Sequence, residues 1–139
     1  MYRTPSGDDY PSVTNVLGIL PKPELDACKA SVGPEEVEKA SLRATRNGSV
    51  AHSRMEEYVD GQDPSTFRFN SIRQLVTFET LRTAVDDHLT NVIAQEIYLY
   101  SDTLRMAGAC DLVGSWDGIP AVIDYKTSGR PVFPEEIEN

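Results

Sequence analysis

The chain contains only two cysteines, Cys28 and Cys110, which lie far apart in the sequence and form no Cys-x-x-Cys pair. This scarcity argues against a disulfide framework and a zinc knuckle, and it makes a reducing cytoplasm the expected location. No apolar run approaches the roughly 20 residues of a membrane-spanning helix. Residues 1–10 lack a basic stretch followed by an apolar one, so we expect neither a signal peptide nor a membrane partner.

Basic residues are also scarce. Thirteen Lys and Arg stand against 22 Asp and Glu, which gives a formal net charge of −9. Charge alone would predict that such a chain repels nucleic acid. The 40% share of hydrophobic residues and the 25% share of charged residues are those of a globular protein rather than a disordered one. The length favours a single domain over residues 1–139.

Hydrophobic spacing predicts that residues 11–90 are mainly helical. Ser12 is placed to cap a short helix that Pro21 and Pro23 end. Further along, acidic residues after Pro34 suit the start of a helix, and Asn47-Gly48 is typical of the end of one. The expected helices therefore cover residues 13–20, 34–47, 49–60 and 72–90, with a loop over 62–70.

The period then changes to that of strands, over residues 92–100, 104–116 and 119–126. Asp117-Gly118 predicts a tight hairpin turn between the last two strands. Cys110 falls in an apolar strand pattern and is expected to be buried. Helices followed by three successive strands predict an α+β fold with an antiparallel meander over residues 91–127, followed by an acidic tail over 128–139.

Three charged residues of the last two strands point to a chemical site. Because strand side chains alternate between faces, Asp124 and Lys126 point the same way, and the hairpin can bring Asp111 beside them at about 5 Å. Paired carboxylates can hold Mg²⁺ or Mn²⁺, which activates a bound water and neutralises charge on a phosphate oxygen. Lys126 would orient that water or stabilise the developing charge. The alternative is an edge strand whose charges simply face water.

These residues also carry a resemblance to a known family. Gly108-x-x-Asp111 followed by residues 123–128, Ile-Asp-Tyr-Lys-Thr-Ser, resembles the core of the PD-(D/E)XK nucleases, in their RecB-like exonuclease branch. Residues 46–52 are similar to that branch's Arg-Gly-x-x-x-His segment, with one extra residue after Arg46. Residues 11–17 resemble the opening of phage exonucleases and of mitochondrial genome maintenance exonucleases. Glu96 matches an acidic residue of the first core strand.

The resemblance implies a set of roles at the site. His52, Asp111 and Asp124 would ligate Mg²⁺ or Mn²⁺, with the backbone carbonyl of Tyr125 completing the protein ligands. Lys126 would be the catalytic lysine. Glu96 would order water, hold a second ion or pair with Lys126. Glu56, one turn after His52, would support that histidine or lie on a solvated helix face. For DNA, the candidate contacts are Arg43, Arg46, Arg54, Thr127 and Ser128, with ordinary surface charge as the alternative for the arginines.

The family core continues beyond the Asp-x-Lys strand with a helix carrying Gln-x-x-x-Tyr and a further strand. Residues 127–139 contain neither Gln nor Tyr. We therefore expect the fold to be completed by a second polypeptide, by residues outside this sequence or by a second copy, and the isolated chain to be weakly active. The expected function is that of a metal-dependent, exonuclease-like deoxyribonuclease. The alternative is a non-catalytic interaction or DNA-binding subunit that keeps the nuclease fold.

Overall fold

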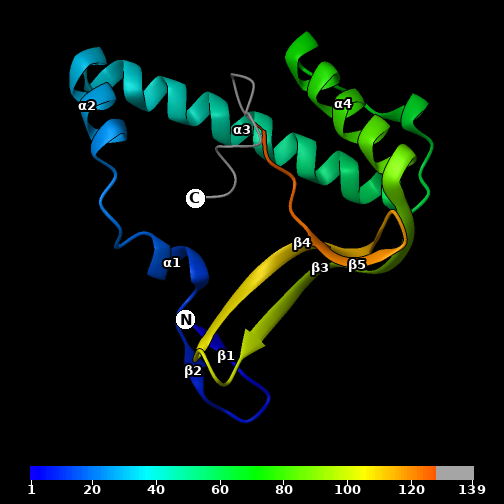
Figure 1. Ribbon diagram of the computed structural model, residues 1–139. Helices are drawn as coiled ribbons and strands as arrows, with labels where there is room; N and C mark the ends of the chain where they lie inside the picture. The colour runs from blue at the N-terminus through cyan, green and yellow to red at the C-terminus, as the bar shows by residue number, and fades with distance from the viewer. Residues whose placement is uncertain (128–139) are drawn as a thin grey trace.

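The computed structural model describes residues 1–127, apart from the side chains of residues 24, 25 and 28 (Figure 1). The expectations for the acidic tail, for Ser128 and for the Cys28 side chain lie outside the described residues. In chain order the elements are β1 (Tyr2–Arg3), β2 (Asp9–Tyr10), α1 (Val13–Leu17), α2 (Pro23–Val32), α3 (Pro34–Val59), the 3₁₀ helix η1 (Pro64–Thr66), α4 (Ile72–His88), β3 (Leu89–Ser101), β4 (Met106–Trp116) and β5 (Ile119–Ile123).

A three-stranded antiparallel sheet follows the helices, which confirms the predicted α+β class. β4 is the central strand and pairs with β3 on one side and β5 on the other. The predicted Asp-Gly hairpin is present, because Asp117 and Gly118 have φ of 50° and 80° between the paired residues Trp116 and Ile119. β3 and β4 form a long hairpin that reaches from the α3–α4 region to β1 and β2 (Figure 1).

The predicted break at Asn47-Gly48 is wrong, since α3 runs without interruption from Pro34 to Val59. Glycine inside a helix costs only about 1 kcal/mol relative to alanine, which tertiary packing readily outweighs. This packing lies just after the glycine in the same helix, where the side chains of Ala51 and Met55 are only 1% and 0% exposed. Asn47 accepts a hydrogen bond from the Gln74 side chain of α4 instead of ending the helix.

Several other boundaries also differ from the sequence prediction. α2 was missed, although Pro23 begins it as a first-turn proline. The hairpin of β1 and β2 was missed as well, and it is fixed to the rest of the molecule by the Tyr10 hydroxyl, which donates to Asp102. β5 ends at Ile123 rather than at residue 126, because the Tyr125 amide donates to the Asp111 carboxylate instead of to a strand carbonyl.

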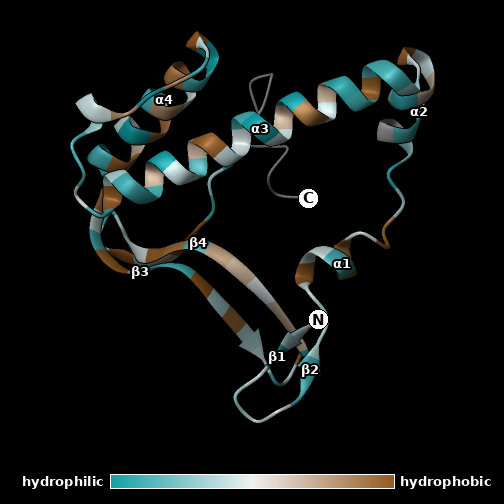
Figure 2. Cartoon of the chain, turned by 180° about the vertical axis from the view of Figure 1, so that it is seen from behind, coloured by the Kyte–Doolittle hydropathy of each residue, from teal (hydrophilic) through white to brown (hydrophobic). Residues whose placement is uncertain are grey.

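The core lies between the C-terminal half of α3, the helix α4 and the adjoining end of the sheet. Figure 2 shows hydrophobic residues in brown at intervals along α3 and α4 and in the strands. Six buried residues form the core: Met55, Phe67, Phe78, Val85, Leu112 and Tyr125. Three aromatic rings surround Phe78 with centroids 5.4–6.0 Å away. Cys110 is buried at the edge of this region, as predicted.

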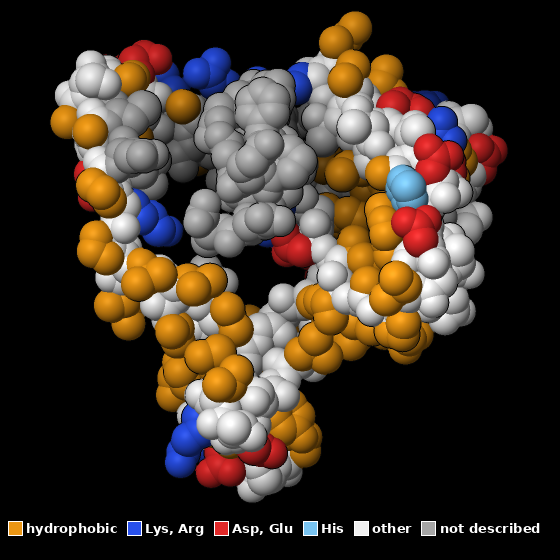
Figure 3. Space-filling view, viewed as in Figure 1, with side chains coloured by type: hydrophobic (Ala, Val, Ile, Leu, Met, Phe, Trp, Pro, Cys, Tyr) orange, Lys and Arg blue, Asp and Glu red, His pale blue; other side chains and the backbone are white. Residues whose placement is uncertain are grey.

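Apolar side chains remain exposed away from this core. Leu17, Ile19 and Leu20 are 53%, 82% and 60% exposed, and Figure 3 shows hydrophobic side chains gathered over α1 and the segment after it. None of the described helices is both long enough and apolar enough to cross a bilayer. Polar side chains gather elsewhere, where the sheet packs against α3 beside the core.

Candidate metal centre

Three side chains from three different elements converge beside the core. His52 comes from α3, Glu96 from β3 and Asp111 from β4, and one ligand atom of each lies within 4.8 Å of the others. His52 and Asp111 are partly buried, whereas Glu96 is exposed. His52 Nδ1 lies 3.3 Å from Asp111 Oδ1. These three residues, the "cluster" below, are close enough to share one ion.

Tyr125 connects the cluster to the segment after β5. Its backbone amide donates to Asp111 Oδ2 at 2.6 Å, and its carbonyl oxygen lies 2.7 Å from His52 Nε2. Its ring is buried against the edge of the His52 ring, with centroids 5.8 Å apart. Burial, together with the negative charges of Asp111 and Glu96, raises the pKa of the Tyr125 hydroxyl to about 12. The ring thus belongs to the core and is not free to stack on a base.

The contacts of His52 define which of its nitrogens faces the cluster. A carbonyl oxygen only accepts, so Nε2 carries a proton and donates to Tyr125. In a neutral imidazole, Nδ1 then presents a lone pair to the Asp111 carboxylate, an arrangement of two acceptors that a cation between them stabilises. A second nitrogen held by a backbone carbonyl is the usual support of a metal-bound histidine. The structure therefore gives the Tyr125 carbonyl an orienting role toward His52.

Glu96 has an unusual backbone for a strand residue. Its φ is 47°, and it stands opposite Asp111, between the paired positions Gln95–Leu112 and Ile97–Cys110. A left-handed conformation costs a non-glycine residue about 1–2 kcal/mol, and such residues gather at functional sites. Although Glu96 is exposed as a whole, partial desolvation of its carboxyl raises the pKa of this group. The nearby carboxylates of Asp111 and Glu56 raise the pKa further, against a smaller opposing effect of His52.

Asp124 and Lys126 do not join the cluster. The Lys126 ammonium forms an ion pair with the Asp124 carboxylate, and their side chains are 81% and 47% exposed. They do share a face, as the alternation predicted, with Tyr125 buried on the other. However, β5 ends before them, so Asp111 meets the backbone of Tyr125 rather than the carboxylate of Asp124. Lys126 likewise pairs with Asp124 and not with Glu96.

The candidate DNA contacts separate into two groups. Arg43, Arg46 and Thr127 line a groove between α3 and α4. Arg54 instead pairs with Glu57 and lies over the Phe67 ring, 5.3 Å from its centroid. Arg73 of α4 also lines the groove, and sequence reasoning missed it, because a lone arginine in the first turn of a helix carries no signal of its own.

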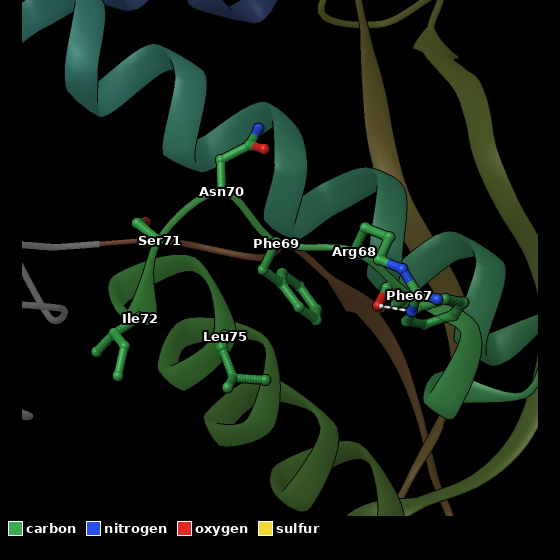
Figure 4. Close-up of a pocket in the computed structure, with 7 residues that line it drawn as sticks. All are labelled: Phe67, Arg68, Phe69, Asn70, Ser71, Ile72 and Leu75. Carbon is green, nitrogen blue, oxygen red and sulfur yellow. Dashed lines mark hydrogen bonds between the residues drawn. The ribbon is translucent and has the colours of Figure 1, made fainter.

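A smaller apolar pocket of ≈ 340 Å³ lies beside the first turn of α4, between Phe69, Ile72 and Leu75 (Figure 4). Among the described residues, Arg68 is the one charged residue of the lining, and that side chain donates to the backbone carbonyls of Thr66 and Phe67. The lining within residues 1–127 offers a cation neither a carboxylate nor an imidazole. The polar chemistry is therefore at the cluster.

The donors present suit a divalent cation with mixed preferences. Two carboxylates favour Mg²⁺ or Mn²⁺, while the imidazole adds a nitrogen ligand that Mn²⁺ accepts more readily than Mg²⁺.

No family model matches the chain, and no curated protein matches it. The functional interpretation consequently depends on the fold and on the geometry of the cluster.

Proposed function

We propose that this protein is a metal-dependent deoxyribonuclease, exonuclease-like and similar in its site to the RecB-like branch of the PD-(D/E)XK nucleases. The observation that carries the proposal is the convergence of His52, Glu96 and Asp111, from three elements, with the Tyr125 backbone bonded to both His52 and Asp111. A bound Mg²⁺ or Mn²⁺ would supply an activated water and neutralise charge on a phosphate.

The chain's own residues have distinct tasks in this proposal. Asp111 and His52 would hold the cation, and the Tyr125 backbone fixes both of them, one through its amide and one through its carbonyl. Glu96, whose pKa is raised, is suited to take up a proton from the attacking water. Lys126 is exposed and can reach a phosphate once Asp124 releases it, which also frees the Asp124 carboxylate to approach the cluster.

A second candidate is a non-catalytic DNA-binding or interaction subunit. The ion pair between Lys126 and Asp124 favours this candidate. In the nuclease proposal both side chains act at the phosphate or the cation, whereas in the structure they bind each other. In either case we propose DNA as the ligand, a cytoplasmic location, and a further polypeptide or a second copy of the chain as partner.

Calorimetric titration of the protein with Mn²⁺, followed by cleavage assays, separates the two candidates. Asp111→Asn should abolish the Mn²⁺ heat, whereas Asp87→Asn, the same change at an exposed position on α4, should leave it unchanged. Linear and circular DNA, single- and double-stranded, then report the cleavage mode. If the folded protein binds no Mn²⁺ in the presence of DNA, the nuclease proposal is wrong and the second candidate is favoured.

A further inference from the structure

A basic groove lies between α3 and α4, next to the cluster. Its volume is ≈ 670 Å³, and three of its lining side chains are arginines: Arg43, Arg46 and Arg73. The other lining residues are alanines and uncharged polar residues, and among the described residues none that lines the groove is acidic or aromatic. In a chain with a net charge of −9, such a concentration of positive charge is unexpected for an ordinary surface.

The three arginines are available to a ligand. All three are exposed, and none of them forms an ion pair or hydrogen bond with another residue in the described range 1–127. By contrast, Arg54 pairs with Glu57 and Arg82 pairs with Glu79. An unpaired guanidinium presents its donors in a planar fork that matches the oxygens of a phosphate.

Hydrogen bonds of the Gln74 side chain fix the spacing of these arginines. Gln74 is 3% exposed, and its side chain accepts from the Asn70 amide and donates to Asn47 Oδ1. The bond to Asn47 joins α4 to α3, and the bond from Asn70 fixes the Gln74 side chain in place. Arg73 is the neighbour of Gln74, and Arg46 is the neighbour of Asn47. The arginines are therefore held on two elements whose separation is set before any ligand binds.

One end of the groove lies near the segment that contacts the cluster. Thr127 lines it and follows Tyr125 by two residues, a distance of at most about 7 Å along the chain. Arg46 and Arg43 precede His52 on α3 by six and nine residues, which places them about 9 and 14 Å from it along the helix axis. At about 100° per residue, Arg46 and Arg43 are also turned about 120° and 180° around α3 from His52. A strand with one phosphate at the cluster would therefore pass Thr127 and curve around α3 to place its next phosphates at these arginines.

We propose that the groove binds the sugar–phosphate backbone of one nucleic-acid strand that leads away from the cluster, with Arg43, Arg46 and Arg73 neutralising successive phosphates. This inference rests on the proposed function, because it takes the reacting phosphate to lie at the cluster. The volume is that of a pocket for a small ligand, which accommodates a short piece of one strand and not a duplex. With no aromatic lining residue for stacking, recognition is independent of base sequence.

Fluorescence anisotropy with labelled single-stranded oligonucleotides in EDTA tests the groove without any cleavage. Over a NaCl series, the logarithm of the binding constant should fall with a slope of about −2, since each neutralised phosphate contributes about 0.7 on a single strand. Arg46→Gln and Arg73→Gln should each reduce the magnitude of that slope by about 0.7. Arg82→Gln makes the same charge change on α4 outside the groove and should leave the slope unchanged.

The outcomes divide clearly. Equal losses on two oligonucleotides of unrelated sequence, with Arg82→Gln unaffected, support the proposal. It is overturned if the wild type binds no oligonucleotide, if groove and control variants lose binding equally, if duplex binds as tightly as single strand, or if inorganic tripolyphosphate competes as well as the oligonucleotide. Failure of the proposed nuclease function would appear instead in the Mn²⁺ titration and the cleavage assay, which this measurement does not use.

Discussion

The backbone of Glu96 provides a sharp test of the cluster, since its conformation and its carboxylate can be changed separately. At a φ of 47°, alanine retains a cost of about 1–2 kcal/mol that glycine does not have. Glycine at an ordinary strand position is less stable than alanine by roughly 0.5–1 kcal/mol, because it loses more freedom on folding. The difference, roughly 0–1.5 kcal/mol, predicts that Glu96→Gly is at least as stable as Glu96→Ala, by about 0.75 kcal/mol at the midpoints of the two ranges.

Urea unfolding of both variants measures this difference, and Ala109→Gly provides the control. Ala109 is exposed on β4 with an ordinary backbone, so glycine there should lower the free energy of unfolding by roughly 0.5–1 kcal/mol. Both Glu96 variants should also weaken the binding of Mn²⁺, which the Ala109 variant should not. If Glu96→Gly is less stable than Glu96→Ala by as much as the Ala109 change costs, Glu96 is not strained and the reasoning is refuted.

Three further predictions concern the fold. Gly114→Ala should strongly destabilise the protein, because a Cβ there would lie 2.3 Å from the Asn91 carbonyl oxygen. Gly48→Ala, whose Cβ would lie 3.5 Å from Thr127 Oγ1, should instead raise the melting temperature through a gain of up to about 1 kcal/mol. A lower melting temperature of Gly48→Ala would contradict the continuous helix. Phe78→Ala should cost about 3–5 kcal/mol by thermal unfolding, since the ring is fully buried, and a loss below about 1 kcal/mol would contradict its central place. Tyr10→Phe removes the 2.8 Å bond to Asp102, and limited proteolysis should then cleave within residues 1–10 faster; unchanged cleavage would show that the bond does not anchor β1 and β2.

The strands were more predictable than the helices because their signals are local. The Asp117-Gly118 turn and the largely apolar strand-like segments on either side specify the hairpin without reference to the rest of the chain. The end of a helix at Asn47-Gly48 depended instead on what packs there. Local chemistry favours a stop, but the Asn47–Gln74 hydrogen bond and the burial of Ala51 and Met55 come from elements that the local sequence does not specify.

The same distinction explains the site. Alternation correctly placed Asp124 and Lys126 on one face, yet it could not show which atoms of this segment reach Asp111. That depends on where β5 stops pairing. Because the ladder ends at Ile123, the Tyr125 amide takes the Asp111 oxygen, and the Asp124 carboxylate is left to Lys126. Periodicity specifies the face of a side chain, whereas the order of ligands around an ion depends on the exact end of the strand.

The net charge of −9 was a poor guide for a related reason. A sum over the chain carries no information about position, and two of the acidic residues that precede the groove on α3, Glu35 and Glu36, pair with Lys39. Arg43, Arg46 and Arg73 meet only because α3 and α4 pack side by side. An electrostatic attraction for a polyanion therefore arises from the tertiary arrangement of a few unpaired arginines, and it is compatible with an acidic protein whose carboxylates lie elsewhere or gather where a cation would bind.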